Sequence, residues 1–342
     1  MVMQKQVDVT ALFDGGSYNA GFIVIKPTNN SILLYRTLQS SMSKPTVRFE
    51  QRALNSAIKK IKKSGLKVSF LNKNLFRDGR DYFENPRRYF APDNMPRCSR
   101  GKTKQHNCAV VVHNNWIVSK AAKVYRYREN LMWMYDGDNQ YYTSSTRRYL
   151  TYNNQAPTMP ATGLSNVSQT ALTASEISAL KTAMIIGYLL NRTVILPRFH
   201  AGPKAVEVPL NYILHMTSFD KYFAGSYREN SFVRHPKVPA VVKSELSKQS
   251  FIEKIKGLSL AHQNVTILDT DIVRKFGGTK ARVLAFATLH YVLITLTSNT
   301  KNNLLIEKLR EAFFRSSSRQ YKRWQLPDQS FVSRLYLTEA KY

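Results

Sequence analysis

The stretch Ala109-Val110-Val111-Val112-His113-Asn114-Asn115-Trp116 decides how the N-terminal part of this chain is expected to fold. Four small residues, three of them valine, predict a buried strand, and the strand delivers a histidine, two asparagines and a tryptophan at its carboxyl end. In open α/β sheets, ligands bind beyond the carboxyl ends of the strands. We therefore expect one edge of a site at His113.

Two earlier segments fit the same α/β organisation. Asn19-Ala20-Gly21 precedes a predicted buried strand at residues 22–25, and a glycine there allows close approach to the backbone. Glu50-Gln51 opens a helix predicted from residue 49 to 63, and Asn55 lies one turn further on. Taken singly, each segment also has an ordinary explanation: a turn, a first-turn acid favoured by the helix dipole, or a surface histidine.

The charge balance is strongly basic. The 342 residues contain 51 Lys plus Arg against 22 Asp plus Glu, a formal net charge of +29 at pH 7. Such a chain attracts nucleic acid, acidic membrane or phosphorylated small molecules. However, the densest basic run, at residues 59–63, falls on the solvated face of a predicted helix, and no zinc-finger, RNA-binding-strand or leucine-zipper pattern occurs. Nucleic acid is therefore not an expected partner.

The pattern predicts two α/β units. Residues 1–136 alternate short strands and helices. Residues 137–162 are rich in Asn, Thr, Ser, Pro and Tyr, which is typical of a linker. Residues 163–342 form the second unit.

The second unit is predicted to begin with a helix capped by Thr173, with Glu176 completing a capping box. A buried strand at residues 193–197 follows. Later elements are expected at three ranges: a strand at 265–268, a strand at 282–286 and a helix at 302–315. No catalytic constellation is evident in this unit, and its most notable polar residues are Arg192, Glu229 and His235.

Three blocks carry a resemblance to a known family. They are residues 15–22 (Gly-Gly-Ser-Tyr-Asn-Ala-Gly-Phe), 49–55 (Phe-Glu-Gln-Arg-Ala-Leu-Asn) and 111–117 (Val-Val-His-Asn-Asn-Trp-Ile), with Lys120 and Lys123 behind them. In this order they resemble the nucleotide-diphospho-sugar transferases, and among them glycosyltransferase family 77, which includes extensin arabinosyltransferase-like proteins. The second unit is similar to the C-terminal region of those members at residues 188–197, 208–211, 227–232 and 235–236.

The resemblance implies a partial GT-A-like nucleotide-sugar transferase domain followed by a second α/β domain. It implies retaining transfer of a pentose or hexose from a nucleotide-diphospho-sugar, UDP-linked, to a glycan or glycoprotein acceptor. The implied catalytic residues are Gln51, near the anomeric carbon, and its neighbour Glu50, while His113 would bind Mn²⁺ or Mg²⁺. The implied substrate contacts are Asn19, Ala20, Gly21, Asn55, Asn114, Asn115, Trp116, Lys120 and Lys123, with the lysines toward the diphosphate.

The chain departs from the family pattern at its start. The family's Asp-x-Asp motif, which supplies the other metal ligands, lies upstream of the matching blocks, and neither Asp8 nor Asp14 reproduces it. Ser119 stands where the family often has glycine. We therefore expect an N-terminally truncated transferase. A Golgi-lumenal location and any membrane anchor belong to a longer form.

Two other classes of function stay open. The chain would be a non-catalytic pseudoenzyme or a glycan- or protein-binding scaffold if the donor site has been lost. More remotely, its charge would make it a basic nucleic-acid-binding protein with salt-sensitive affinity.

The residues bearing on the cellular compartment permit more than one interpretation. Cys98 and Cys108 would close a disulfide loop in an oxidising compartment or remain two unrelated thiols. Sequons at Asn29, Asn166, Asn191 and Asn264 permit a secretory address. The most apolar stretch, residues 283–296, is interrupted by His290 and is shorter than the ~20 residues of a membrane span.

Overall fold

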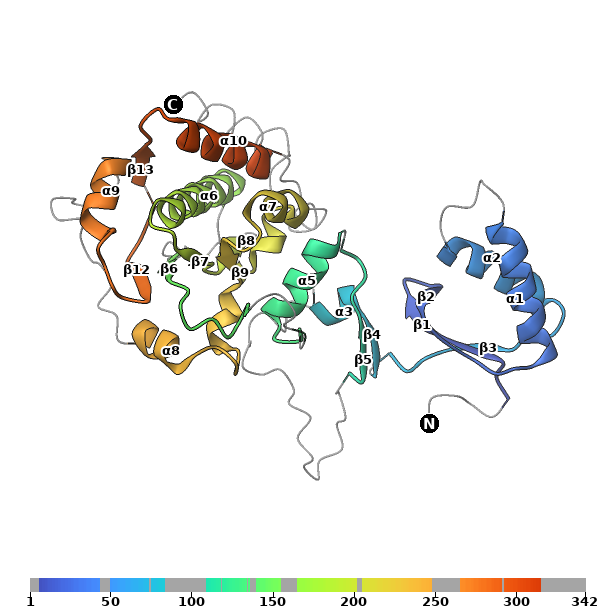
Figure 1. Ribbon diagram of the computed structural model, residues 1–342. Helices are drawn as coiled ribbons and strands as arrows, with labels where there is room; N and C mark the ends of the chain where they lie inside the picture. Colours follow the sequence, from blue (N-terminus) through green and yellow to red (C-terminus); the bar gives the residue numbers. More distant parts are fainter. Residues whose placement is uncertain are drawn as a thin grey trace. The chain divides into compact units, whose positions relative to one another are not determined.

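The computed structural model (Figure 1) consists of helices and of sheets that contain parallel strands, which confirms the predicted α/β class. The structure describes residues 6–43, 50–73, 75–83, 109–117, 119–133, 135, 140–154, 165–201, 205–247, 265–290 and 292–314. Cys98 and Cys108 lie outside these ranges, so the predicted disulfide stays a prediction.

The chain divides into two compact units, residues 1–118 and residues 119–342. The division predicted from the sequence lies later, with a linker at residues 137–162. Strand β6 (Tyr149–Tyr152) falls inside that predicted linker and belongs to the sheet of the second unit. Its sequence, Tyr-Leu-Thr-Tyr, has the β-propensity of a strand, but its Asn-, Thr- and Ser-rich surroundings conceal it.

The N-terminal unit is built on a hairpin. β1 (Val9–Asp14) pairs antiparallel with β2 (Ser17–Ile25), and β3 (Val68–Phe70) pairs parallel with β1 on its other side. Gly15 and Gly16 make the turn with φ values of 58° and 96°, a conformation that glycine adopts without strain. Residues 19–21 therefore lie inside β2, and the expected turn before residue 22 was wrong because the two glycines take the turn earlier.

Two helices pack against this hairpin. Helix α1 (Asn29–Met42) begins at Thr28, whose backbone N–H and hydroxyl form a capping box with Ser31. Helix α2 (Glu50–Lys62) turns its apolar stripe inward and leaves its lysines exposed, as its sequence pattern predicts. The core that they share consists of Val9, Leu34, Leu54, Ala57, Ile58, Ile61 and Leu66.

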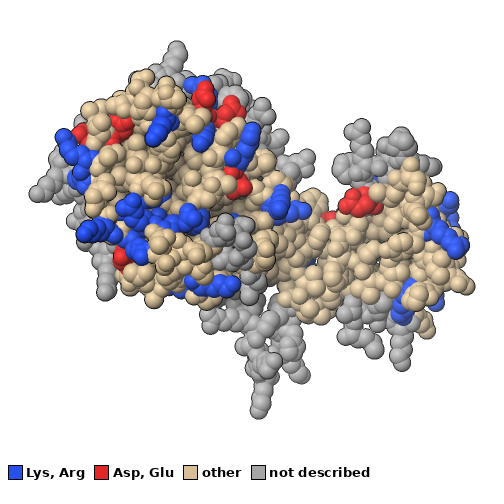
Figure 2. All heavy atoms as spheres, in the orientation of Figure 1, with Lys and Arg blue, Asp and Glu red and all other residues tan. Residues whose placement is uncertain are grey.

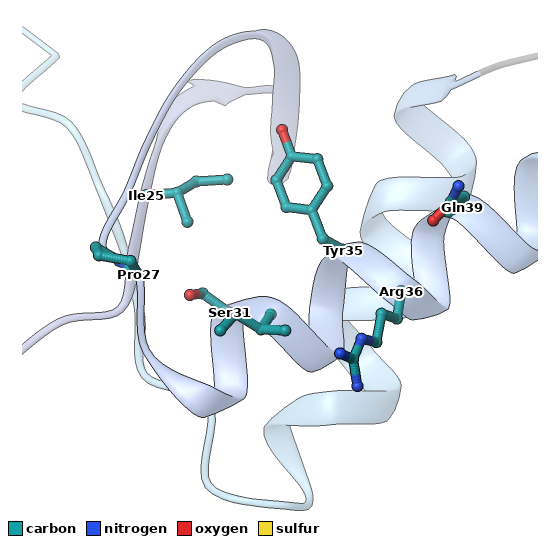
Figure 3. Close-up of a pocket in the computed structure, with 7 residues that line it drawn as sticks. Ile25, Pro27, Ser31, Tyr35, Arg36 and Gln39 are labelled. Atoms are coloured by element: carbon teal, nitrogen blue, oxygen red, sulfur yellow. The ribbon is translucent and has the colours of Figure 1, made fainter.

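Helix α1 also borders a pocket of about 300 Å³ (Figure 3). None of the site residues predicted from the sequence lines it. Its lining residues are Ile25, Pro27, Ser31, Ile32, Tyr35, Arg36 and Gln39.

A second strand pair completes the described part of this unit. β4 (Phe76–Asp78) pairs parallel with β5 (Val111–His113), and helix α3 (Gly79–Phe83) follows β4 directly. The register places Asp78 opposite His113, so both strands end at one edge. The strand predicted at residues 109–112 begins two residues later than expected and delivers His113 at its carboxyl end, as predicted.

The C-terminal unit is organised around a parallel sheet. β6 pairs with β7 (Thr193–Ile195) and with β12 (Val283–Phe286), and β10 (Tyr227–Arg228) pairs with β7. The strand order is β10-β7-β6-β12, and every described pairing in this sheet is parallel. A buried aromatic and aliphatic cluster that includes Tyr149, Ile195 and Val283 packs beside it.

Helices and short strands surround this sheet. The two other strand pairs are β8 (Phe199–Ala201) with β9 (Val206–Val208), antiparallel, and β11 (Val265–Leu268) with β13 (Val292–Thr295), parallel. The helices are α5 (Lys120–Glu129), α6 (Asn166–Leu189), η2 (Leu210–Tyr212), α7 (Met216–Phe223), η3 (Asn230–Arg234), α8 (Ala240–Ser247), α9 (Asp269–Phe276) and α10 (Thr300–Phe314).

Helix α6 begins earlier than predicted. Its N-cap is Ser165, whose hydroxyl accepts a hydrogen bond from the backbone N–H of Ser168. The predicted cap Thr173 instead lies one turn after Gln169, whose backbone carbonyl accepts its hydroxyl hydrogen. Glu176 is fully buried and bonds residues outside the helix. The Thr-x-x-Glu spacing imitates a capping box because the two residues share a buried polar face.

The surface of both units carries basic side chains. Figure 2 shows Lys and Arg spread over both units on the visible face. Among the helices that the structure describes, none combines the length and apolar character needed to cross a bilayer.

Candidate functional site

The Asp14 carboxylate is the centre of the candidate site. Its Oδ2 accepts hydrogen bonds from Asn19 Nδ2 at 2.8 Å and Gln51 Nε2 at 3.0 Å, and its Oδ1 accepts one from Trp116 Nε1 at 2.8 Å. Asn115 Nδ2 lies 3.5 Å from Oδ2. Four side chains predicted as site residues from the sequence thus converge on one buried acid.

Local structure explains where this acid lies. Asp14 is the last residue of β1, immediately before the glycine turn, and only 8% of its surface is exposed. Ser17 closes the turn by donating its hydroxyl to the backbone carbonyl of Asp14. A carboxylate removed from water needs hydrogen-bond donors, and the four surrounding N–H groups supply them.

Gly21 lies against the imidazole of His113. A Cβ atom at Gly21 would lie 2.3 Å from His113 Cε1 and 2.6 Å from its Nε2, closer than atoms can approach. The backbone N–H of Gly21 donates to Asn19 Oδ1 at 2.7 Å. Only glycine therefore allows β2 and the end of β5 to meet with the imidazole in this position.

The end of β5 is tied to the start of α3. Asn115 Oδ1 accepts a hydrogen bond from the backbone N–H of Gly79 at 2.6 Å, and the Arg80 guanidinium lies 4.6 Å from the centre of the Trp116 ring. Trp116 adopts a positive φ of 58° and is 48% exposed. The indole is thus fixed by Asp14 and Arg80 while part of its ring faces solvent.

Gln51 presents one polar atom that no described residue uses. A carboxylate only accepts hydrogen bonds, so the amide must turn Nε2 toward Asp14, and its carbonyl oxygen Oε1 then points elsewhere. No described residue donates to Oε1. The side chain is partly exposed, so this oxygen can bind a ligand.

The other predicted contacts in this unit have varied surroundings. Asn55 bonds both the N–H and the carbonyl of Tyr18, which fastens α2 to β2. Glu50 is exposed at the start of α2, Ala20 packs against the core, and Asn114 is buried. The roles assigned to these residues stay predictions.

Lys120 and Lys123 belong to the second unit. Both are exposed in the first turn of α5, whose N-cap Ser119 accepts a hydrogen bond from the backbone N–H of Ala122. Ser119 has a φ of 84°, a left-handed conformation in which glycine is more easily accommodated. The predicted contact of the two lysines with a diphosphate stays a prediction.

The described residues do not complete a metal site. Within them, no group of three or more His, Cys, Asp and Glu side chains lies close enough together to hold an ion. His113 is the predicted ligand, but most acceptor positions of the nearby Asp14 carboxylate already receive N–H groups. A divalent cation that prefers several oxygen ligands would find too few here.

Comparison with protein families gives one match. The model of the nucleotide-diphospho-sugar transferase family matches residues 1–127. This segment belongs to that family. The match supports the resemblance found in the sequence, and the narrower assignment to glycosyltransferase family 77 and the truncation stay predictions. Neither curated proteins nor solved structures yielded a match to the chain.

Three residues of the transferase segment were missed or undervalued in the sequence. Asp14 lacks the Asp-x-Asp spacing of the family motif, and no motif in the sequence singles out Gly79 or Arg80. The available signal was an acid at the end of a buried strand, directly before a Gly-Gly turn. Gly79 and Arg80 gave none, since only the pairing of β4 with β5 brings them to Asn115 and Trp116.

Proposed function

We propose that the protein transfers a pentose or hexose from a UDP-linked nucleotide-diphospho-sugar to a glycan or glycoprotein acceptor, with retention of anomeric configuration. The family of residues 1–127 suggests a sugar transferase. The donor, the acceptor and the stereochemistry are parts of the proposal.

One observation carries it. Side chains from β2, from α2 and from the segment after β5 meet at Asp14 although they are far apart in the sequence. A cluster of amides around a buried acid is more polar than hairpin packing requires, and buried polar networks need a full set of partners to be stable. Such an arrangement holds functional groups in a fixed geometry.

The geometry suggests a division of roles. Gln51 is the residue that contacts the sugar near its anomeric carbon, because its Oε1 is available. Asn19 has a positioning role, because the Nδ2 and Oδ1 atoms of its side chain both form hydrogen bonds within the unit. Trp116 has an aromatic ring that is partly exposed beside Arg80, and such a ring suits the apolar face of a sugar.

The proposal includes a divalent cation, and His113 is the only residue assigned as its ligand. The described residues do not complete its coordination, so no catalytic step is assigned to it. Mn²⁺ would neutralise diphosphate charge on the leaving group when bound. Lys120 and Lys123 are proposed to interact with donor phosphates, and the Golgi lumen is the proposed location.

The test uses the full chain with Mn²⁺, a panel of UDP-sugars and release of UDP as the readout. Gln51→Ala is expected to lower turnover about a hundredfold or more, because the group removed acts at the reacting centre. His113→Ala should weaken donor binding. Gln39→Ala and His215→Ala, matched residues outside the site, should retain wild-type rates. Unchanged rates in Gln51→Ala and His113→Ala would overturn the assignment.

A second candidate function is a non-catalytic sugar-binding unit. The observation that favours it is that N–H groups of Asn19, Gln51 and Trp116 already occupy most acceptor positions of the Asp14 carboxylate. Calorimetric titration distinguishes the two: a binding unit takes up UDP equally with and without Mn²⁺ and releases no product.

A further inference from the structure

The parallel sheet of the second unit has a reversal of strand order next to its first strand. From β6 the chain proceeds to β7 and then to β10 on one side, and later returns to place β12 on the other side of β6. Because all these pairings are parallel, the carboxyl ends of the strands share one edge. Ligands of open α/β sheets bind at this edge, where the strand order reverses.

Polar residues follow these strands and join into one network. Asn154, two residues after β6, donates its Nδ2 to Glu176 Oε1 at 2.8 Å and to the Arg198 carbonyl at 2.8 Å. Its Oδ1 lies 2.8 Å from His290 Nε2, beyond the end of β12. Residues from both sides of the reversal are thus hydrogen-bonded to each other.

The hydrogen bonds fix the protonation of His290. Both partners of Asn154 Nδ2 are acceptors, so Asn154 Oδ1 must face His290 and receive its Nε2–H. His290 Nδ1 then accepts the hydroxyl hydrogen of Ser175 at 2.7 Å. Burial and the nearby His200 hold the pKa of His290 below its ordinary value, which agrees with a neutral ring.

Two polar groups at this edge have no hydrogen-bond partner among the described residues, and one of them, the Tyr152 hydroxyl, is itself fully buried. His200 bonds Glu176 through Nδ1 and its backbone N–H, while its Nε2 makes no hydrogen bond, and the residue is 4% exposed. The hydroxyl of Tyr152, the last residue of β6, is also buried without a partner. Burial raises the pKa of the Tyr152 hydroxyl well above its ordinary value, and the nearby Glu176 charge raises it further. Unpaired buried polar atoms cost free energy unless something binds them.

The charges around this edge favour an uncharged ligand. Arg198 is paired with Glu129 at 3.2 Å, and His200 is paired with Glu176. Neither Arg198 nor His200 is therefore available as an unpaired cation for a phosphate. The remaining nitrogen of His200 accepts a hydrogen bond from a neutral ring or donates one from a protonated ring, and the Tyr152 hydroxyl does either; a polyol presents groups that do both.

We propose that the carboxyl edge of this sheet, centred on Tyr152, His200 and Asn154, binds a neutral sugar residue of the acceptor glycan. The acceptor role rests on the proposed transfer function, while sugar binding itself does not. Ser175 and Arg198 are partly exposed and border the site.

Saturation-transfer difference NMR on the full chain tests this, with methyl glycosides of arabinose, xylose and galactose as probes and no donor present. At least one glycoside should give a signal and shift the imidazole resonances of His200. Tyr152→Phe removes only a hydroxyl that makes no internal bond, so it should weaken binding about tenfold without lowering the unfolding temperature. His215→Gln, a histidine outside the edge, should bind as wild type.

Several outcomes overturn the proposal. They are no signal from any glycoside, equal binding by Tyr152→Phe and wild type, or His200 shifts produced by UDP and not by glycosides. Because no donor is used, glycoside binding without transfer would contradict the proposed function alone, and transfer without His200 shifts would contradict this site alone.

Discussion

Trp116 Nε1 donates a 2.8 Å hydrogen bond to Asp14 Oδ1 across a separation of 102 residues. This bond ties the end of the first hairpin strand to the segment that follows β5. Since Gln51 and Asn19 bond the other oxygen of the same carboxylate, the three segments that resemble the transferase family form one network around Asp14. The Asp14 carboxylate therefore links these three segments at the centre of the site.

Asp14→Asn should therefore damage both stability and function. The neutral amide would turn an N–H group toward at least one of the donors, which leaves buried groups unpaired. We expect a loss of about 2–4 kcal/mol in the free energy of unfolding, measured by urea denaturation. Asp271→Asn, at an exposed carboxylate of α9, serves as the control and should change stability by less than about 0.5 kcal/mol. Equal effects of the two would contradict the central position of Asp14.

Gly21→Ala should displace His113. The added Cβ would meet the imidazole at 2.3 Å, so β2 and the end of β5 must separate. A destabilisation of about 1–3 kcal/mol is expected, together with a changed His113 ring resonance in NMR spectra. Gly278→Ala adds a methyl group where no atom lies within 4 Å and is the matched control. An undisturbed His113 resonance in Gly21→Ala would show that the close approach is not present in solution.

Glu129 should make the stability of the second unit depend on pH. Burial raises its pKa from 4.5 to about 7, and the nearby Arg198 opposes this shift. The folded state then keeps a proton that the unfolded chain loses above pH 4.5. The free energy of unfolding should fall by about 3 kcal/mol as pH rises from 4.5 to 7, and this contribution should be level above pH 7.

Denaturation of wild type and Glu129→Gln at a series of pH values measures this contribution as a difference. Burial also raises the pKa of Glu229 and of Glu176, while that of His290 is lowered, and these groups act in both proteins. The variant should have the shallower decline. Glu307→Gln, on the exposed side of α10, should follow wild type, and parallel curves for Glu129→Gln and wild type would contradict the assignment.

Arg192 should be irreplaceable by lysine. Its guanidinium bonds the carbonyls of Tyr149, Thr279, Ala281 and Arg282, which fastens the chain before β12 to the central strand. A single ammonium group cannot reach all four oxygens. Arg192→Lys is expected to lose about 2–4 kcal/mol by thermal or urea unfolding. Arg274→Lys, at an 81% exposed side chain of α9, should be near neutral, and a similar result at Arg192 would show that those bonds contribute little.

Much of the fold could be predicted from local patterns. The stripe of α2 from Leu54 to Ile61, the strand that ends at His113, and the strand at residues 265–268 depend on periodicity and composition within a few residues. Errors arose where local rules gave the same signal for two structures. Thr173 and Glu176 match a capping box, yet they lie within α6 and face the buried network.

The sequence by itself determined the family of residues 1–127, the order of most elements and the Gly-Gly turn, because these depend on short motifs and on backbone preferences at single positions. Only the tertiary structure decided that Asp14 is the centre of the first site and that Asn154, His200 and His290 share one edge of the second sheet. Most of those contacts join residues tens to more than a hundred positions apart. Strand pairing sets them, and no local pattern records which strands will be neighbours.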